Sequence, residues 1–368
     1  MHFEINPEDY MKEELVVDYY KFRDMPWVSK SKLLTWRMCN KLFKMTEIDK
    51  LETKSIDGIM EDKRDKGTNC HLVFSLFFKV VKKMDLVKRF MDVPVEVSSK
   101  SSFLYYAFYD ICNQILPKSL RGDRDTQIIV SNFAEYQNLY WIYLREKFGN
   151  KREVFDMYWV PLHVEVYMEN YEEMVYGTLD AVYRNPRYES NGKGRIANAK
   201  YVLVDYKTGN VPAEVRNGEG LPTEKMAELH FYAWLISIAH TLTGYEEIET
   251  LDEKFVKVKM KKPVYEKVFK DVTDFKQVLA NEVFLGAEKP YFVDPRKPND
   301  KSLGAVIRDI KALREMWKKN GPWSPPDNDY VCDNICSANS TCIDEEIKRA
   351  KYGPGGPGVG DFSSSTAL

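Results

Sequence analysis

The sequence predicts an α/β protein in which a short mixed sheet lies beside a helical insert. Residues 72–150 have a mostly helical pattern, rich in Phe and Tyr, with a polar break at 117–127. Strand patterns dominate residues 154–207, around a loop at 185–199. Because the helical and strand patterns are grouped and do not alternate, they do not indicate a βαβ repeat.

Helical patterns also flank the strand-rich region. Residues 29–43 form an amphipathic pattern with Ser29 or Ser31 as the N-cap. Further helices are expected at 223–241 and 303–319. The sequence thus predicts helices both before and after the strand-rich region along the chain.

The expected domain organisation is one main domain between an N-terminal extension and a flexible C-terminal tail. Residues 1–28 are an N-terminal extension, and residues 29–350 form the domain, with the helical insert at 72–150. A cysteine-rich loop is expected at 320–345. Residues 351–368 are rich in Gly, Pro, Ser and Thr, so we expect a flexible tail.

The composition is that of a globular protein. The chain has 368 residues, is 44% hydrophobic, and carries 54 basic and 56 acidic residues, so its net charge does not indicate a polyanion partner. We find no apolar run long enough to span a membrane and no secretory signal. We therefore expect a cytoplasmic protein that is not bound to a membrane.

The most informative stretch is residues 201–209, where an apolar strand ends in Asp205-x-Lys207. Strand side chains alternate, so Asp205 and Lys207 share a face. The carboxylate can bind a divalent cation, and the ammonium can orient water or stabilise charge on a phosphate. Solvated Asp and Lys residues at a strand end are the alternative. A second strand pattern, at 174–183, adds another acid, Asp180.

Three nearby residues have a functional and a structural interpretation. His71 is expected at the start of a helix, from which it could reach the site, although a lone His is more often packed or on the surface. Gly177, in Gly177-x-x-Asp180, could permit close approach of a ligand or of neighbouring backbone. Glu165 could add a carboxylate, but alternating strands often expose acids.

The helix pattern after the Asp-x-Lys strand contributes two more candidates. Glu228 and Tyr232 are four residues apart and share a helix face, so both could point toward the site. His230 lies on a different face, and we do not expect it to be a ligand.

Cysteines near the C-terminus indicate a metal site. Cys332, Cys336 and Cys342 lie in a polar stretch, although cysteines are normally buried. Three thiolates need a fourth ligand, for which Cys39 is the natural candidate, and both zinc and iron–sulfur clusters accept four thiolates. The remaining cysteines, expected in the core, are Cys70 and Cys112.

A basic strand is predicted at 255–261. Within it, Lys257, Lys259 and Lys261 alternate with apolar residues, so one face is basic. This face is interpreted either as a solvated sheet surface or as a track for a phosphate backbone.

Taken in order, these motifs resemble the RecB-like branch of the PD-(D/E)XK nucleases, particularly the iron–sulfur CRISPR-associated exonucleases of the Cas-four type and the AddB nuclease domain. The resemblance covers residues 29–342. It implies a restriction-endonuclease-like mixed sheet flanked by helices, with an N- and C-terminal subdomain tied by an iron–sulfur cluster. The motifs are an early Cys, the segment Lys66 to His71, Gly177 to Asp180, Asp205 to Gly209, a helix ending in Tyr232, and three late cysteines.

The resemblance also implies roles for individual residues. A catalytic Mg²⁺ or Mn²⁺ would be bound by His71, Asp180 and Asp205, together with Tyr206. Lys207 would assist the water, and Tyr232 and Glu228 would complete the catalytic set. The 4Fe–4S ligands would be Cys39, Cys332, Cys336 and Cys342, with zinc as the alternative metal.

The sequence departs from the family pattern at three points. Glu228 stands where the helix motif usually has Gln, the late cysteines begin with Cys-x3-Cys instead of Cys-x2-Cys, and the interval from His71 to Asp180 is long.

The function expected from these observations is a metal-dependent DNA exonuclease that prefers single strands. Its substrate would be DNA with free ends, and it could act with protein partners in a DNA-processing complex. The alternative is a catalytically silent nuclease-fold protein that binds nucleic acid or a partner. The intact Asp180, Asp205 and Lys207 favour the enzyme.

Overall fold

The computed structural model describes the greater part of the chain, in which contacts define two compact units. One comprises residues 1–15 and 66–307, and the other residues 16–65 and 308–368. The described residues are 5, 27–50, 58–93, 102–170, 172–188, 198–217, 221, 223–251, 257–293 and 300–323.

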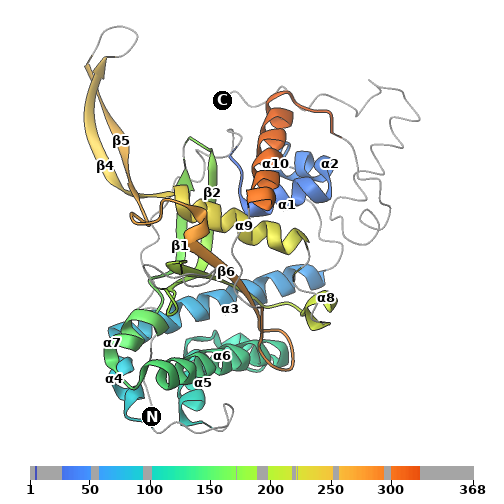
Figure 1. Cartoon of the computed structure of the whole chain (residues 1–368). Helices are drawn as coiled ribbons and strands as arrows, with labels where there is room; N and C mark the ends of the chain where they lie inside the picture. The colour runs from blue at the N-terminus through green and yellow to red at the C-terminus, as the bar shows by residue number, and fades with distance from the viewer. Residues whose placement is uncertain are drawn as a thin grey trace. The chain divides into compact units, whose positions relative to one another are not determined.

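The first unit contains a mixed sheet with strand order β5-β4-β1-β2-β3-β6-β7 (Figure 1). Neighbouring strands are antiparallel except β3 and β6, which are parallel, so the predicted mixed sheet is confirmed. The strands are β1 (His163–Asn170), β2 (Val175–Arg184), β3 (Tyr201–Lys207), β4 (His240–Leu251), β5 (Lys257–Lys267), β6 (Val278–Phe284) and β7 (Tyr291–Phe292).

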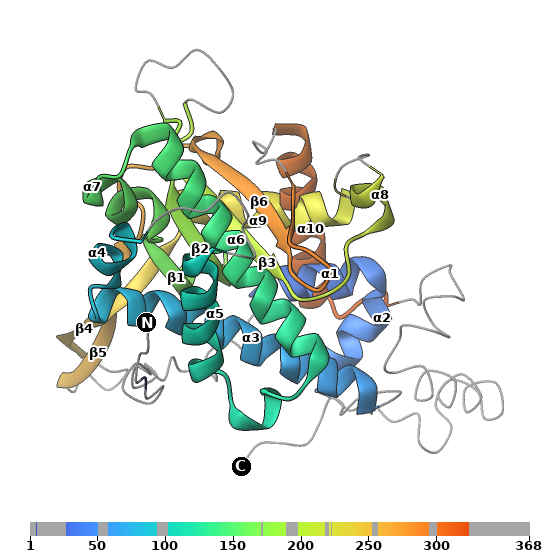
Figure 2. The ribbon, with the colours of Figure 1, turned by 90° about the horizontal axis from the view of Figure 1, so that it is seen from below.

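A layer of helices covers one face of this sheet, and Figure 2 looks onto that layer. It corresponds to the predicted helical insert, and its polar break at 117–127 contains a short 3-10 helix, Lys118–Leu120. The helices are α3 (Gly58–Lys83), α4 (Leu86–Met91), α5 (Phe103–Ile115), α6 (Arg124–Phe148) and α7 (Arg152–Val154), followed by a π-helix, Phe155–Trp159.

Local sequence sets the ends of these helices. Ser102 caps α5 by accepting the Tyr105 N–H at 3.1 Å, and Asp123 caps α6 by accepting the Thr126 N–H at 2.9 Å. Gly149 ends α6 in a backbone conformation with φ of 81°, which glycine adopts without steric cost.

Aromatic side chains hold this layer together. Phe77 of α3 makes edge-to-face contacts with Phe108, Phe133 and Trp159, with ring centroids 5.7, 5.4 and 6.1 Å apart. Such pairs each contribute about 0.5–1.5 kcal/mol beyond the burial of their area. Tyr206 of the sheet joins the same core.

Helix α9 (Thr223–Ile238) packs against strands of the sheet beside the short helix α8 (Ala213–Arg216) and a 3-10 helix, Phe275–Gln277. A Cβ added at Gly177 would lie 3.1 Å from the ring of Tyr232 and 3.2 Å from Leu235. The close neighbours of Gly177 are therefore side chains of α9, and not the ligand or backbone that the sequence analysis considered.

The second unit joins residues 16–65 to residues 308–368. It contains α1 (Lys30–Met38), α2 (Asn40–Phe43), a π-helix at Lys44–Ile48 and the C-terminal part of α10 (Asp300–Lys318). Ser29 caps α1 as predicted, accepting the Lys32 N–H at 3.2 Å.

Side chains connect the early helices of this unit to α10. Arg37 donates from Nε to Asp309 at 2.8 Å, and Phe43 packs edge-to-face on Trp317 at 5.4 Å. None of the described helices is both long enough and apolar enough to cross a membrane.

Three boundaries differ from the prediction. The first strand begins at His163, because residues 155–159 form a π-helix. Helix α9 ends at Ile238, since His240 already belongs to β4. His71 lies well inside α3, and its expected place at the start of a helix was wrong because that helix begins at Gly58.

Candidate active site

Four acids form a line across four adjacent strands. The β1–β2 register places Glu165 opposite Asp180. Strands β2 and β3 pair Ala181 with Val204, so the next positions, Asp180 and Asp205, face each other. Strands β3 and β6 pair Asp205 directly with Glu282. Residues at facing positions of neighbouring strands lie close together, so the sheet brings these carboxylates to one place.

The first group of possible metal ligands is His71, Glu165 and Asp180. His71 Nδ1 lies 3.4 Å from Asp180 Oδ1 and 3.7 Å from Glu165 Oε1. Burial lowers the pKa of His71, but hydrogen bonds and charge from Asp180 and Glu165 outweigh it and raise the pKa to about 10. Without a cation, the imidazole is therefore protonated at neutral pH.

Asp180 links the first group to the next strand. Its Oδ2 accepts the backbone N–H of Tyr206 at 2.7 Å. Burial and the charge of Asp205 raise the pKa of Asp180 and His71 lowers it, so that the pKa lies at about 6. Asp205 is therefore close enough to Asp180 for its charge to affect the pKa of Asp180.

Glu165 has an unusual backbone. Its φ of 46° is in the left-handed region, within an otherwise extended strand. Such a conformation costs of order 1–3 kcal/mol for a residue other than glycine, and strained residues of this kind cluster at active sites. The sequence allowed two interpretations of Glu165, a metal ligand or an exposed acid. In the structure it belongs to the first group of possible ligands.

The second group surrounds Lys207. Its Nζ lies 2.7 Å from Asp205 Oδ2, 3.0 Å from Glu228 Oε2 and 3.7 Å from Glu282 Oε1. Burial lowers the pKa of Lys207, but the charges of Asp205, Glu228 and Glu282 raise it well above its ordinary value. Lys207 is thus a permanent cation that can donate hydrogen bonds and cannot act as a base.

Helix α9 contributes Glu228 to this second group. The side chain is 4% exposed and forms a second ion pair, with Lys225 Nζ at 2.9 Å. Glu228 therefore points toward the site, as expected from its position on the helix face. Tyr232, one turn later, packs on Gly177 and is not among the residues of the two ligand groups.

Glu282 is the site residue that sequence analysis missed. It is 0% exposed, and neither carboxylate oxygen has a hydrogen bond in the part of the chain that the structure describes. Burial and the charges of Asp205 and Glu228 raise its pKa and Lys207 lowers it, so that the pKa lies at about 7. An acid this buried and unbonded is expected where a cation or a proton completes its environment.

Two further residues of the motifs point away from the groups. The Tyr206 hydroxyl lies 2.8 Å from that of Tyr183 in the helix-covered core, so only the Tyr206 backbone is at the site. His230 is buried and, among the described residues, neither ring nitrogen has a hydrogen bond. Burial lowers its pKa, and His230 belongs to neither group of possible metal ligands.

The cysteine predictions fall partly outside the described residues. Cys39 is buried at the start of α2, and its Sγ accepts the Leu42 N–H at 3.2 Å. Cys70 and Cys112 are buried in the core as predicted. The other three predicted ligands, which lie outside the described residues, are Cys332, Cys336 and Cys342.

The three lysines of the predicted phosphate track lie on β5. The β4–β5 register places Glu249 opposite Lys259 and Glu247 opposite Lys261, and Lys257 pairs with Leu251.

The two groups suit a hard divalent cation. The ligand atoms within each group lie within 4.8 Å of one another, and all but one are carboxylate oxygens. Oxygen ligands are preferred by Mg²⁺ and Mn²⁺, and an imidazole nitrogen favours the latter. The unbonded carboxylate of Glu282 and the raised pKa of Asp180 show excess negative charge that a cation would neutralise.

Comparison with protein families agrees with this geometry. The model of the PD-(D/E)XK nuclease superfamily matches residues 28–343, a range that contains both groups and all of the sheet. No curated protein sequence matches the chain. The extent of the family match and the acid–lysine site on a mixed sheet together show that the chain belongs to the PD-(D/E)XK nuclease superfamily.

Proposed function

We propose that this protein is a DNA exonuclease that hydrolyses phosphodiester bonds with the help of Mg²⁺ or Mn²⁺. The observation that carries the proposal is the line of four carboxylates beside a half-buried, protonated lysine. When bound, the cation would neutralise the phosphate and lower the pKa of an attacking water.

In this proposal the cation would be held by His71, Asp180 and Asp205, with the Tyr206 backbone beside them. Glu165 is added to this set because its carboxylate lies 3.7 Å from the His71 ring nitrogen. The same two carboxylates that would bind the cation also raise the pKa of His71. Cation and proton therefore compete, and binding should release a proton.

Lys207 would orient the attacking water or stabilise charge on the phosphate by donating hydrogen bonds. Glu228 and Glu282 hold its ammonium from two sides, at 3.0 and 3.7 Å. Glu228 also keeps a negative charge where the related motif usually has Gln. Its expected role is to position Lys207.

The preference for single-stranded DNA ends rests on the resemblance to RecB-like nucleases. The same resemblance supports a 4Fe–4S cluster on Cys39, Cys332, Cys336 and Cys342, with zinc as the alternative. Cys39 belongs to the compact unit that joins residues 16–65 to residues 308–368, the arrangement that such a cluster would stabilise.

The test uses linear and circular single-stranded DNA of one sequence, and linear duplex, each with Mn²⁺, Mg²⁺ or EDTA. We expect the linear single strand to be degraded with either metal, the circle to persist, and EDTA to stop the reaction. Cleavage of the circle would refute the exonuclease mode. Binding of all three DNAs without cleavage would favour the catalytically silent alternative.

A further inference from the structure

A cavity lies on the opposite face of the sheet from the acidic groups. Its volume is about 500 Å³, within the range of small-molecule sites. Val204 and Asn281 line it, and the residues that follow each of them, Asp205 and Glu282, belong to the acidic line. Because strand side chains alternate, β3 and β6 separate the two sites.

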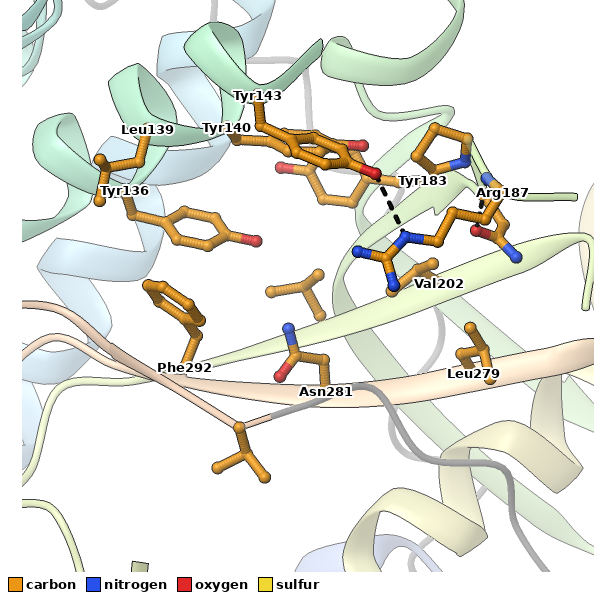
Figure 3. Close-up of a pocket in the computed structure, with 14 residues that line it drawn as sticks. Tyr136, Leu139, Tyr140, Tyr143, Tyr183, Arg187, Val202, Leu279, Asn281 and Phe292 are labelled. Carbon is orange, nitrogen blue, oxygen red and sulfur yellow. Dashed lines mark hydrogen bonds between the residues drawn. The ribbon is translucent and has the colours of Figure 1, made fainter. Parts of the chain in front are cut away.

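The walls of the cavity are mainly aromatic (Figure 3). Tyr136, Tyr140 and Tyr143 share one face of α6, at spacings of four and three residues, and Tyr183 comes from β2. Phe292 of β7 faces Tyr136, with ring centroids 6.3 Å apart. Such rings offer flat surfaces on which a planar group can stack.

Most of the tyrosine hydroxyls are already used within the protein. Tyr183 pairs with Tyr206 at 2.8 Å, and Tyr140 donates to the Tyr158 carbonyl at 3.0 Å. Burial raises the pKa of Tyr136, whose hydroxyl points into the cavity in Figure 3. The tyrosines therefore offer ring faces and neutral hydroxyls, and no negative charge.

Asn281 provides the polar group of the cavity. The side chain is 7% exposed, and its Oδ1 has no hydrogen bond within the described part of the chain. A buried acceptor without a partner is costly, so this position suits a ligand that donates a hydrogen bond to Asn281 Oδ1. An amide has both a donor and an acceptor, and can pair with the edge of a nucleobase.

Arg187 adds positive charge at the rim. Its Nε donates to the Tyr143 hydroxyl at 3.2 Å, and its guanidinium lies over that ring, 5.8 Å from the centroid. The side chain is exposed. A guanidinium held in this way favours an anionic group, and its fork suits phosphate.

We propose that this cavity binds a nucleobase together with its phosphate. The base would stack against the aromatic wall, its edge would meet the Asn281 amide, and the phosphate would lie near Arg187. The ligand is either a free mononucleotide or a base turned out of a single strand. This binding does not depend on the proposed hydrolysis, because the site lies on the other face of the sheet.

The test is calorimetric titration of the full chain in EDTA, which prevents binding of phosphate through a divalent cation. The ligands are the four deoxynucleoside monophosphates, deoxyribose 5-phosphate and a short oligothymidylate. We expect at least one monophosphate to bind at least tenfold more tightly than the sugar phosphate, because stacking requires the base. Tighter binding of the oligonucleotide than of the monophosphates would identify a strand as the source.

Variants assign the binding to the cavity. Phe292→Ala and Arg187→Gln should each weaken nucleotide binding about tenfold, given the contribution of one stacked base or one charged contact. Tyr188→Ala and Arg184→Gln are matched controls, since neither residue lines the cavity.

Asn281→Leu replaces the amide by an apolar side chain, which cannot pair with the edge of a base, and should weaken nucleotide binding. Should that variant fail to fold by circular dichroism, Phe292→Ala carries the test, because Phe292 is 54% exposed and its loss does not disturb the core. Absence of nucleotide binding would overturn the proposal, as would equal binding of the sugar phosphate or wild-type affinity in Phe292→Ala and Arg187→Gln.

Discussion

Replacing Glu282 by Gln should remove a pH-dependent weakness of the metal-free protein. The pKa of this carboxyl is raised from 4.5 to about 7, mainly by burial. A raised acid pKa means that its contribution to stability is fully present below pH 4.5 and is lost as the pH rises through 7. At about 1.4 kcal/mol per pKa unit, the loss between pH 5 and pH 9 is about 2–3 kcal/mol.

The assay is urea unfolding in EDTA at several pH values, for the wild type, Glu282→Gln and the exposed control Glu146→Gln. Glutamine has no charge to bury, so the free energy of unfolding of Glu282→Gln relative to the wild type should rise by about 2–3 kcal/mol from pH 5 to pH 9. Effects of shape and lost contacts are the same at each pH and cancel. Parallel pH profiles for the wild type and Glu282→Gln would refute the account of this buried acid.

Three other predictions concern the remaining parts of the proposal. Lys207→Gln should lower the initial rate of DNA cleavage at saturating Mn²⁺ on the order of 10²-fold, and a wild-type rate would exclude Lys207 from the reaction. Replacing Lys257, Lys259 and Lys261 together by Gln should flatten the salt dependence of DNA binding by about one unit of slope per lost phosphate contact, whereas an unchanged slope would mean a solvated face. Anaerobically purified protein should be brown, absorbing near ~400 nm, and Cys39→Ser should lose colour and iron, whereas a colourless protein with one zinc would replace the cluster by a zinc site.

Local periodicity was enough to predict part of the site. Asp205 and Lys207 share a face because strand side chains alternate over two residues, and Glu228 reaches the same place from a helix whose spacing is equally regular. Glu282 could not be found in this way. It lies in a strand whose residues are all buried, and only the parallel pairing of β6 with β3 brings it beside Asp205.

The position of His71 was misjudged for a related reason. The polar run around Gly67 has the composition of a helix start, but α3 begins at Gly58 and continues through it. A Cβ at Gly67 would lie 3.3 Å from Thr208 Oγ1, so the glycine allows the turn after β3 to approach the helix. Such long-range contacts override local helix signals.

The most direct test of the central claim is Mn²⁺-dependent cleavage of end-labelled single-stranded DNA by the wild type, Asp205→Asn and the control Asp125→Asn. Asp125 lies exposed in the first turn of α6, far in sequence from the acidic line. The wild type and Asp125→Asn should cleave at similar rates, and Asp205→Asn should be slower on the order of 10²-fold or more, because it lacks a carboxylate for the cation. Equal rates for all three proteins, or cleavage that persists in EDTA, would contradict the proposal that the line of carboxylates is a metal-dependent nuclease site.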